Sequence, residues 1–97
     1  MSKASDDVLA ERMRQVEREG WNHEHDDLHR DGGLAQAAAC YAAHAGGMPQ
    51  SGYGSMPYWP WDDDWWKPKD PRRDLVRAGA LILAEIERID RAAVAPK

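Results

Sequence analysis

The sequence has few of the residues that usually fill a core or cross-link a chain. Its 97 residues include no phenylalanine, one cysteine and only 13 leucine, isoleucine and valine residues together. The lone Cys40 cannot form a disulfide within the chain, which excludes a disulfide framework and indicates a reducing compartment. At this length we expect a single domain, 1–97, with a thin core.

The sequence also lacks an excess of basic charge and any long apolar run. Its net charge is −4, whereas nucleic-acid binders need a basic face, so we expect no direct DNA binding. The longest apolar run, Ala78 to Ala84, is far shorter than the roughly 20 residues that span a bilayer. The acidic N-terminal region does not resemble a secretory signal. We therefore expect a cytoplasmic protein without a membrane partner.

Common catalytic motifs are missing as well. The sequence has no glycine-rich phosphate loop, no nucleophile elbow and no Cys-x-x-Cys pair. Cys40 lies in an alanine-rich segment, where burial raises the pKa of a thiol rather than lowering it. P-loop, hydrolase and redox functions are thereby disfavoured.

The residues that are present predict an all-α fold with three main helices at about 5–19, 33–45 and 71–93. Their ends carry local signals: Ser5 as a cap, Gly20, Gly46-Gly47 and Asp70-Pro71. In the first helix, Val8, Leu9, Met13 and Val16 are spaced to face a core. The opposite face is expected to be solvated; it carries Glu11, Arg12, Arg14, Glu17 and Arg18.

The last helix has an apolar stripe of Leu75, Ile82, Ile86 and Ile89. Its turn from Ala78 to Ala84 is apolar all round and must be covered on every side. Three short helices offer little cover, so we expect a homodimer that packs through this helix.

The long segment 46–70, rich in Trp and Pro, joins the second and third main helices. We expect 46–55 to be flexible and the aromatic second half to form a strap across the helices. Aromatic side chains supply core volume that the aliphatic residues do not, which predicts that Trp61, Trp65 and Trp66 are structural. Alternatively, some rings stack on a nucleotide base while basic residues near 71 meet its phosphates. The candidate ligand-binding residues are Trp59, Trp61, Trp66, Lys67, Arg72 and Arg73.

A dense polar cluster spans 23–31. Carboxylates such as Glu24, Asp26 and Asp27 suit Mg²⁺ or Mn²⁺, although a solvated loop neutralised by its own histidines and Arg30 explains the same residues. Zinc is a weaker alternative. The pairs His25/His29 and Cys40/His44 are each spaced i, i+4 and together could form a tetrahedral zinc site, but the 10-residue gap between His29 and Cys40 fits no familiar zinc spacing.

Several motifs together resemble small uncharacterised proteins of bacteriophages and prophages, over nearly the whole chain. They include Glu19-Gly20-Trp21, Glu24-His25-Asp26-Asp27, Trp59-Pro60-Trp61-Asp62, Arg72-Arg73-Asp74-Leu75-Val76 and Ala84-Glu85-Ile86-Glu87-Arg88. This resemblance implies a phage-type accessory protein but no particular activity.

The chain is more distantly similar to MazG-like all-α nucleotide pyrophosphohydrolases, in which helix-borne carboxylates hold Mg²⁺. The similarity places Asp74 at one acidic position, which makes Glu24, Asp26, Asp27 and Asp74 the candidate metal ligands. Arg77 stands near the companion acidic position, and 29–33 lacks the expected acidic motif. We therefore favour a non-catalytic binder of a nucleotide-like ligand or a host protein, with a metal-dependent MazG-like pyrophosphohydrolase as the alternative.

Overall fold

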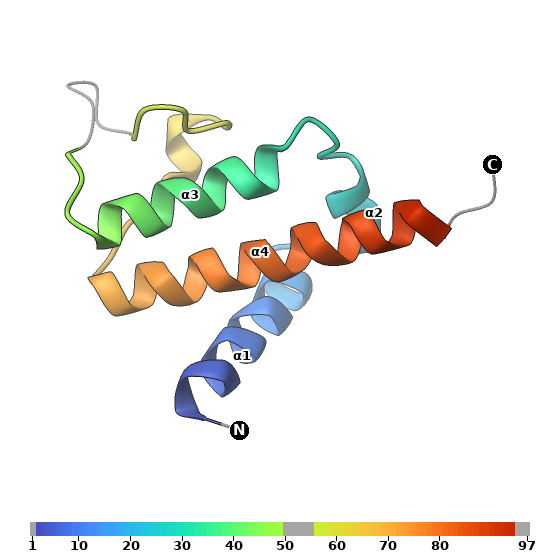
Figure 1. The fold of residues 1–97 in the computed structure, drawn as a ribbon, viewed down its shortest axis with the longest axis horizontal. Coiled ribbons are helices and arrows are strands. Elements are labelled where there is room, and N and C mark those ends of the chain that lie inside the picture. The colour runs from blue at the N-terminus through green and yellow to red at the C-terminus, as the bar shows by residue number, and fades with distance from the viewer. Residues whose placement is uncertain (1, 50–55, 95–97) are drawn as a thin grey trace.

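The fold of the chain, taken from a computed structural model that describes residues 2–49 and 56–94, is all-α as predicted. The helices are α1 (Lys3–Arg18), α2 (His23–Asp27), α3 (Gly33–Ala45) and α4 (Pro71–Val94), with a 3₁₀ turn η1 (Asp63–Trp65). Within these residues no helix is long and apolar enough to cross a membrane. α3 and α4 lie side by side and antiparallel, and α1 crosses the other side of α4 diagonally (Figure 1). The three long helices agree with the predicted ranges.

The helix ends follow the local signals in the sequence, with one shift. The N-cap of α1 is Ser2, which forms a reciprocal capping box with Ser5, so Ser5 is not itself the cap. At α4, the Asp70 carboxylate accepts a hydrogen bond from the backbone N–H of Arg73 at 3.0 Å. Proline at the first helical position then begins the helix, as predicted.

The core lies between α3 and α4 and consists largely of alanine. It contains Leu34, Ala37, Ala38, Tyr41, Ala78, Leu81 and Ala84. Four half-buried tryptophans pack around it, namely Trp21, Trp59, Trp61 and Trp66. Small residues allow the two helices to approach closely, and the indole rings supply the missing volume.

The inward face of α1 is largely polar, which contradicts the predicted orientation for Leu9 and Met13, whereas Val8 and Val16 are half-buried and Val8 lies against Gly79 of α4. Glu11, Arg12 and Gln15 are 2%, 7% and 2% exposed, whereas Leu9 and Met13 are 44% and 60% exposed. The buried charged groups are satisfied by partners on α2 and α4, described below. The amphipathic pattern is wrong here because it assumes that an inward polar side chain finds no partner.

The buried face of α4 also differs from the prediction. The stripe Leu75, Ile82, Ile86 and Ile89 is about half exposed. Leu81 and the small side chains Ala78, Ala80 and Ala84 face inward and are covered within the chain by α1 and α3. The predicted need for a second subunit around this apolar turn is therefore reduced to the side that carries Ile82.

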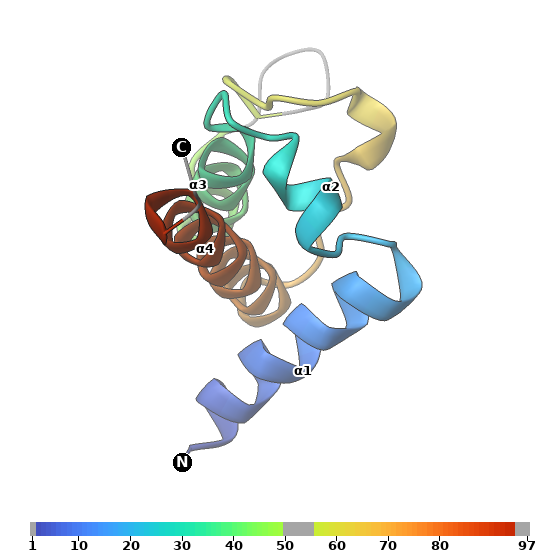
Figure 2. The same cartoon turned by 90° about the vertical axis from the view of Figure 1, so that its right-hand side faces the viewer.

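The described part of the predicted strap runs over α3 to η1 (Figures 1 and 2), and its Trp61 ring lies 5.3 Å from the ring of His29. The Tyr41 hydroxyl accepts a hydrogen bond from the backbone N–H of Lys67 at 3.3 Å, and the Tyr41 ring lies 4.8 Å from Trp66. Trp65 is 49% exposed, so its predicted core role is wrong, whereas Trp61 and Trp66 pack against the core. The flexibility expected for 46–55 falls largely on 50–55, outside the described residues.

Candidate functional site

An aromatic cavity of about 390 Å³ lies where the end of α1, α2 and the strap meet. We call it the Trp–His pocket; it is lined by Glu19, Trp21, His25, His29, Trp61, Asp62 and Trp65. Gly20, with a backbone φ of 72°, makes the turn that brings Trp21 back from α1 towards α2. Residues from three separate segments thus form one concave site.

The rings of this pocket contact one another as a continuous set. Trp21 stacks on His25 with centroids 5.6 Å apart and planes 7° apart. Trp61 lies 5.3 Å from His29 and 5.9 Å from Trp21, both tilted. Trp65 completes the set at 6.5 Å from Trp21. The pocket therefore offers flat faces at several angles to a ligand.

His25 is held in place by a buried ion pair. His25 Nδ1 lies 3.1 Å from Asp26 Oδ1, and the Asp26 side chain is fully buried. Arg12 donates to Asp26 Oδ2 at 2.7 Å and to the carbonyl oxygen of Trp21 at 3.0 Å. This pair fixes α2 and Trp21 relative to α1.

The histidines also interact with each other, with a distance of 3.3 Å between the Nε2 atoms of His25 and His29. Burial lowers the pKa of His29, and the neighbouring His25 lowers it further. A lowered pKa disfavours the protonated form of His29, which argues against the predicted neutralisation of the acidic cluster by this histidine.

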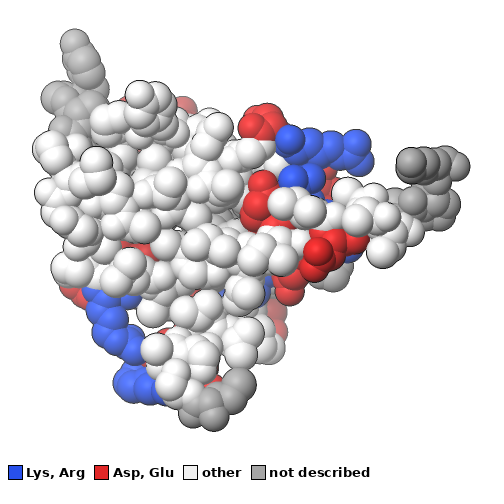
Figure 3. Space-filling model, viewed as in Figure 1, with Lys and Arg blue, Asp and Glu red and all other residues white. Residues whose placement is uncertain are grey.

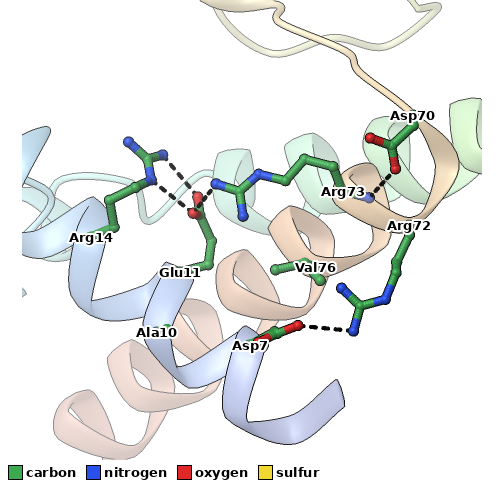
Figure 4. Close-up of a pocket in the computed structure, with 8 residues that line it drawn as sticks. All are labelled: Asp7, Ala10, Glu11, Arg14, Asp70, Arg72, Arg73 and Val76. Atoms are coloured by element: carbon green, nitrogen blue, oxygen red, sulfur yellow. Dashed lines mark hydrogen bonds and ion pairs between the residues drawn. The ribbon is translucent and has the colours of Figure 1, made fainter. Parts of the chain in front are cut away.

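A second cavity, of about 370 Å³, lies between α1 and the start of α4 (Figure 4). We call it the arginine pocket; its charged residues are Asp7, Glu11, Arg14, Asp70, Arg72 and Arg73. Every arginine there meets a carboxylate, with Arg72 2.9 Å from Asp7 and Arg14 2.8 Å from Glu11. Arg73 also donates to Glu11. The cationic side chains are thus charge-balanced rather than free for an anion.

The charges around Glu11 decide its protonation. Burial raises the pKa of the Glu11 carboxyl, but the hydrogen bonds from Arg14 and the charge of Arg73 outweigh this and leave the pKa below its usual value. Glu11 therefore stays ionised and holds α1 against α4.

A narrow cavity of about 20 Å³ lies between the two pockets. Among its lining residues, Glu11 and Arg14 also line the arginine pocket and Trp21 also lines the Trp–His pocket. Gln15 Oε1 and Arg77 Nε are buried without a hydrogen-bond partner, and both residues line this cavity. Its volume is enough for about one water molecule. The two larger pockets are therefore separate sites.

The structure divides the predicted ligand-binding residues among different places. Trp61 lines the Trp–His pocket, whereas Trp59 and Trp66 pack against the core. Lys67 Nζ lies 5.6 Å from the ring of Trp65, beside that pocket. Arg72 and Arg73 line the arginine pocket, away from the rings.

Two tryptophans of the pocket were not among the candidates. Trp21 and Trp65 both line it, and Trp65 was expected to be structural only. Trp21 directly follows Gly20, and a glycine that ends a helix just before an aromatic residue was the one available signal for it.

The four predicted metal ligands do not converge. Asp26 pairs with Arg12, and Asp27 accepts a hydrogen bond from Arg91 at 2.8 Å. Arg91 lies about 25 Å along α4 from Asp74, because an α-helix rises about 1.5 Å per residue. Among the described residues, no three His, Cys, Asp or Glu side chains come together as a metal site. Glu24 is exposed on α2.

Asp74 and the Cys40/His44 pair lie at the other end of the fold. The fully buried Asp74 carboxylate lies 2.7 Å from His44 Nδ1 and accepts from the backbone N–H of Lys69 at 2.7 Å. Cys40 Sγ lies 3.6 Å from the Pro57 carbonyl oxygen, and burial raises the pKa of its thiol. These residues are bound locally and do not join His25 and His29.

The chain matches no protein-family model, no curated protein and no solved structure. The resemblances to phage proteins and to MazG-like enzymes accordingly stay predictions.

Proposed function

We propose that this protein is a non-catalytic binding module whose Trp–His pocket takes the flat ring of a nucleotide-like ligand. The observation that carries this proposal is the enclosure of one cavity of about 390 Å³ by three indole and two imidazole rings. Small-molecule sites are typically concave and mostly apolar, with volumes of about 300–1,000 Å³ and a few polar groups for orientation. The pocket has this character.

A heteroaromatic base suits the pocket better than an aliphatic ligand does. Stacking of a base on an aromatic side chain contributes about 1–3 kcal/mol, and Trp65 offers a half-exposed indole for it. Glu19 and Asp62 line the same cavity and can accept hydrogen bonds from exocyclic amino groups. Lys67, beside Trp65, is placed to meet a phosphate carried by such a base.

Binding without hydrolysis is the better account of the acidic residues. Metal-assisted attack on a phosphate needs several carboxylates in one shell. Here Asp26 is held by Arg12 and Asp74 by His44. The MazG-like alternative would require these pairs to break, so we propose an accessory binding role, in the phage setting that the sequence resemblance implies.

Titration with the four ribonucleoside monophosphates, followed by tryptophan fluorescence and calorimetry, tests the proposal. Trp65→Ala should weaken binding of the preferred nucleotide about 5- to 150-fold, since one stacking contact is lost. Arg72→Ala, in the arginine pocket, is the matched control and should leave the affinity unchanged. Failure of all four nucleotides to bind at millimolar concentration, or equal losses in both variants, would contradict the proposal.

We further propose that the exposed stripe of α4 pairs with a second copy of the chain. Leu75, Ile82, Ile86 and Ile89 are separated by seven, four and three residues, a spacing that suits a helix–helix seam, yet each is about half exposed. The middle of the face seen in Figure 3 carries few charged side chains, whereas charged side chains gather over the C-terminal part of α4. Two such helices related by a two-fold axis would cover each other's stripe.

Light scattering during gel filtration tests the pairing. We expect a dimer for the wild type and a folded monomer for Ile82→Asp, because a charge at the centre of the stripe would be buried unpaired in the dimer. Leu28→Asp is a matched control, since Leu28 is 82% exposed and lies outside the stripe. A monomeric wild type would refute the pairing and leave the stripe to another protein, such as a host partner.

A further inference from the structure

We propose that His25 and His29 form a two-histidine chelating site for a transition-metal ion such as Zn²⁺, Ni²⁺ or Cu²⁺, inside the Trp–His pocket. The site keeps the His25/His29 pair of the zinc alternative raised by the sequence but does not include Cys40 and His44, which have other partners. It differs from the predicted carboxylate site of Glu24, Asp26, Asp27 and Asp74. It also does not depend on nucleotide binding, because it needs the two imidazoles alone.

The first argument is the distance between the two nitrogens. His25 Nε2 and His29 Nε2 lie 3.3 Å apart. Zinc binds imidazole nitrogens at about 2.0–2.1 Å, and a tetrahedral angle then separates the two nitrogens by about 3.3–3.4 Å. The separation of the two nitrogens therefore matches that of two imidazoles bound to a single ion.

The second argument is the partner of the other nitrogen of His25. His25 Nδ1 lies 3.1 Å from Asp26 Oδ1, and the Asp26 side chain is fully buried and held by Arg12 at 2.7 Å. This carboxylate favours the proton on Nδ1 and so leaves a lone pair on Nε2, directed towards His29. A carboxylate that orients a histidine in this way is the usual outer shell of a metal site.

The third argument is that aromatic contacts hold both rings in place. Trp21 stacks parallel on His25 at 5.6 Å, and Trp61 lies 5.3 Å from His29. Rings held in this way lose little freedom when an ion binds.

These features define the class of ion. Neutral imidazole prefers zinc, copper and nickel, whereas Mg²⁺ prefers oxygen ligands. Among the described residues no third His, Cys, Asp or Glu joins the pair. The remaining coordination positions would therefore open into the pocket, where water or a donor atom of a bound ligand can fill them.

Calorimetric titration of the chelator-treated protein with ZnCl₂, NiCl₂, CuCl₂ and MgCl₂, without nucleotide, tests the proposal. We expect one Zn²⁺, Ni²⁺ or Cu²⁺ ion per chain and much weaker binding of Mg²⁺. Because Trp21 and Trp61 flank the pair, Cu²⁺ should quench tryptophan fluorescence at the same stoichiometry. His25→Gln and His29→Gln should each reduce the affinity by at least about tenfold, whereas His44→Gln should not.

Histidine ring signals in the NMR spectrum of the wild-type protein provide a second test that requires no variant. Added Zn²⁺ should shift the ring signals of His25 and His29 and leave those of His44 in place. Absence of these shifts, or an affinity that survives His29→Gln, would overturn the metal site. Because no nucleotide is present, either result leaves the binding function proposed above to its own test.

Discussion

Replacing Arg12 by methionine tests whether the Trp–His pocket depends on one buried ion pair. The Arg12 guanidinium donates to Asp26 and to the Trp21 carbonyl oxygen, and it also lies 3.2 Å from Glu87. Methionine keeps much of the aliphatic stem but removes every one of these donors. Asp26 would then remain buried without its cationic partner.

The structure sets the size of the effect. The paired side chains of Arg12 and Asp26 are 8% and 0% exposed, and removal of one partner of such a pair costs about 3–5 kcal/mol. In a domain of this size about 1 kcal/mol shifts Tm by about 4–8 °C, so Tm should fall by at least about 12 °C. Arg91→Met is the matched control, because its partner Asp27 is 45% exposed and such pairs contribute about 0–1 kcal/mol.

Thermal and urea unfolding followed by far-UV circular dichroism measure both variants. A double variant, Arg12→Met with Asp26→Leu, should regain most of the lost stability, because it leaves no unpaired buried charge. Equal losses for Arg12→Met and Arg91→Met, or no recovery in the double variant, would refute the assignment of this pair as the support of α2.

Three further predictions follow from packing and charge. Trp66→Ala should lower the free energy of unfolding by about 3–5 kcal/mol, because the Trp66 ring packs against the core, whereas Trp65 is half exposed and Trp65→Ala should cost much less. Calorimetric unfolding measures both, and the reverse order would contradict the described packing of the strap. The pKa of Glu11 is lowered in the folded protein, so this carboxylate stabilises the fold above about pH 4.5, and the stabilisation is lost as the pH falls through the folded-state pKa. Glu11→Gln should therefore make the fall in Tm on acidification less steep. An unchanged slope would argue against the pairing of Glu11 with its arginines. Gly79→Leu should lower Tm, because a Cβ added at this position would lie 3.2 Å from the Val8 methyl groups. Val8→Ala in the same chain should restore part of the lost stability, and no recovery would contradict the contact between the two helices.

The helices were predictable because their ends are set by local chemistry. Asp70-Pro71 specifies a helix start within a few residues, and Gly46-Gly47 ends α3 without reference to the rest of the fold. Ser5 was a reasonable cap for α1, but Ser2 offers the same hydroxyl three residues earlier, and the two bond each other. Local signals of equal strength leave such shifts of a few residues undecided.

The site was less predictable because it depends on partners that are distant in the sequence. The residues next to Arg12 in the sequence do not show that it pairs with Asp26 in the interior. The face of α1 that carries Arg12 therefore has the pattern of a solvated surface. In the same way, the spacing of His25 and His29 indicates a shared face, but only the fold brings Trp61 against them. The metal site was not predictable from residue type, because the ion-pair partners of Asp26 and Asp74 lie on other helices.

The most direct test of the central claim is a two-dimensional NMR spectrum of the indole N–H groups during titration with the preferred nucleotide. The five tryptophans give five signals and act as controls for one another. Binding in the Trp–His pocket should shift the signals of Trp21, Trp61 and Trp65 and leave those of Trp59 and Trp66 nearly unchanged. Shifts confined to Trp59 and Trp66, or no indole shift at saturating nucleotide, would contradict the proposed site.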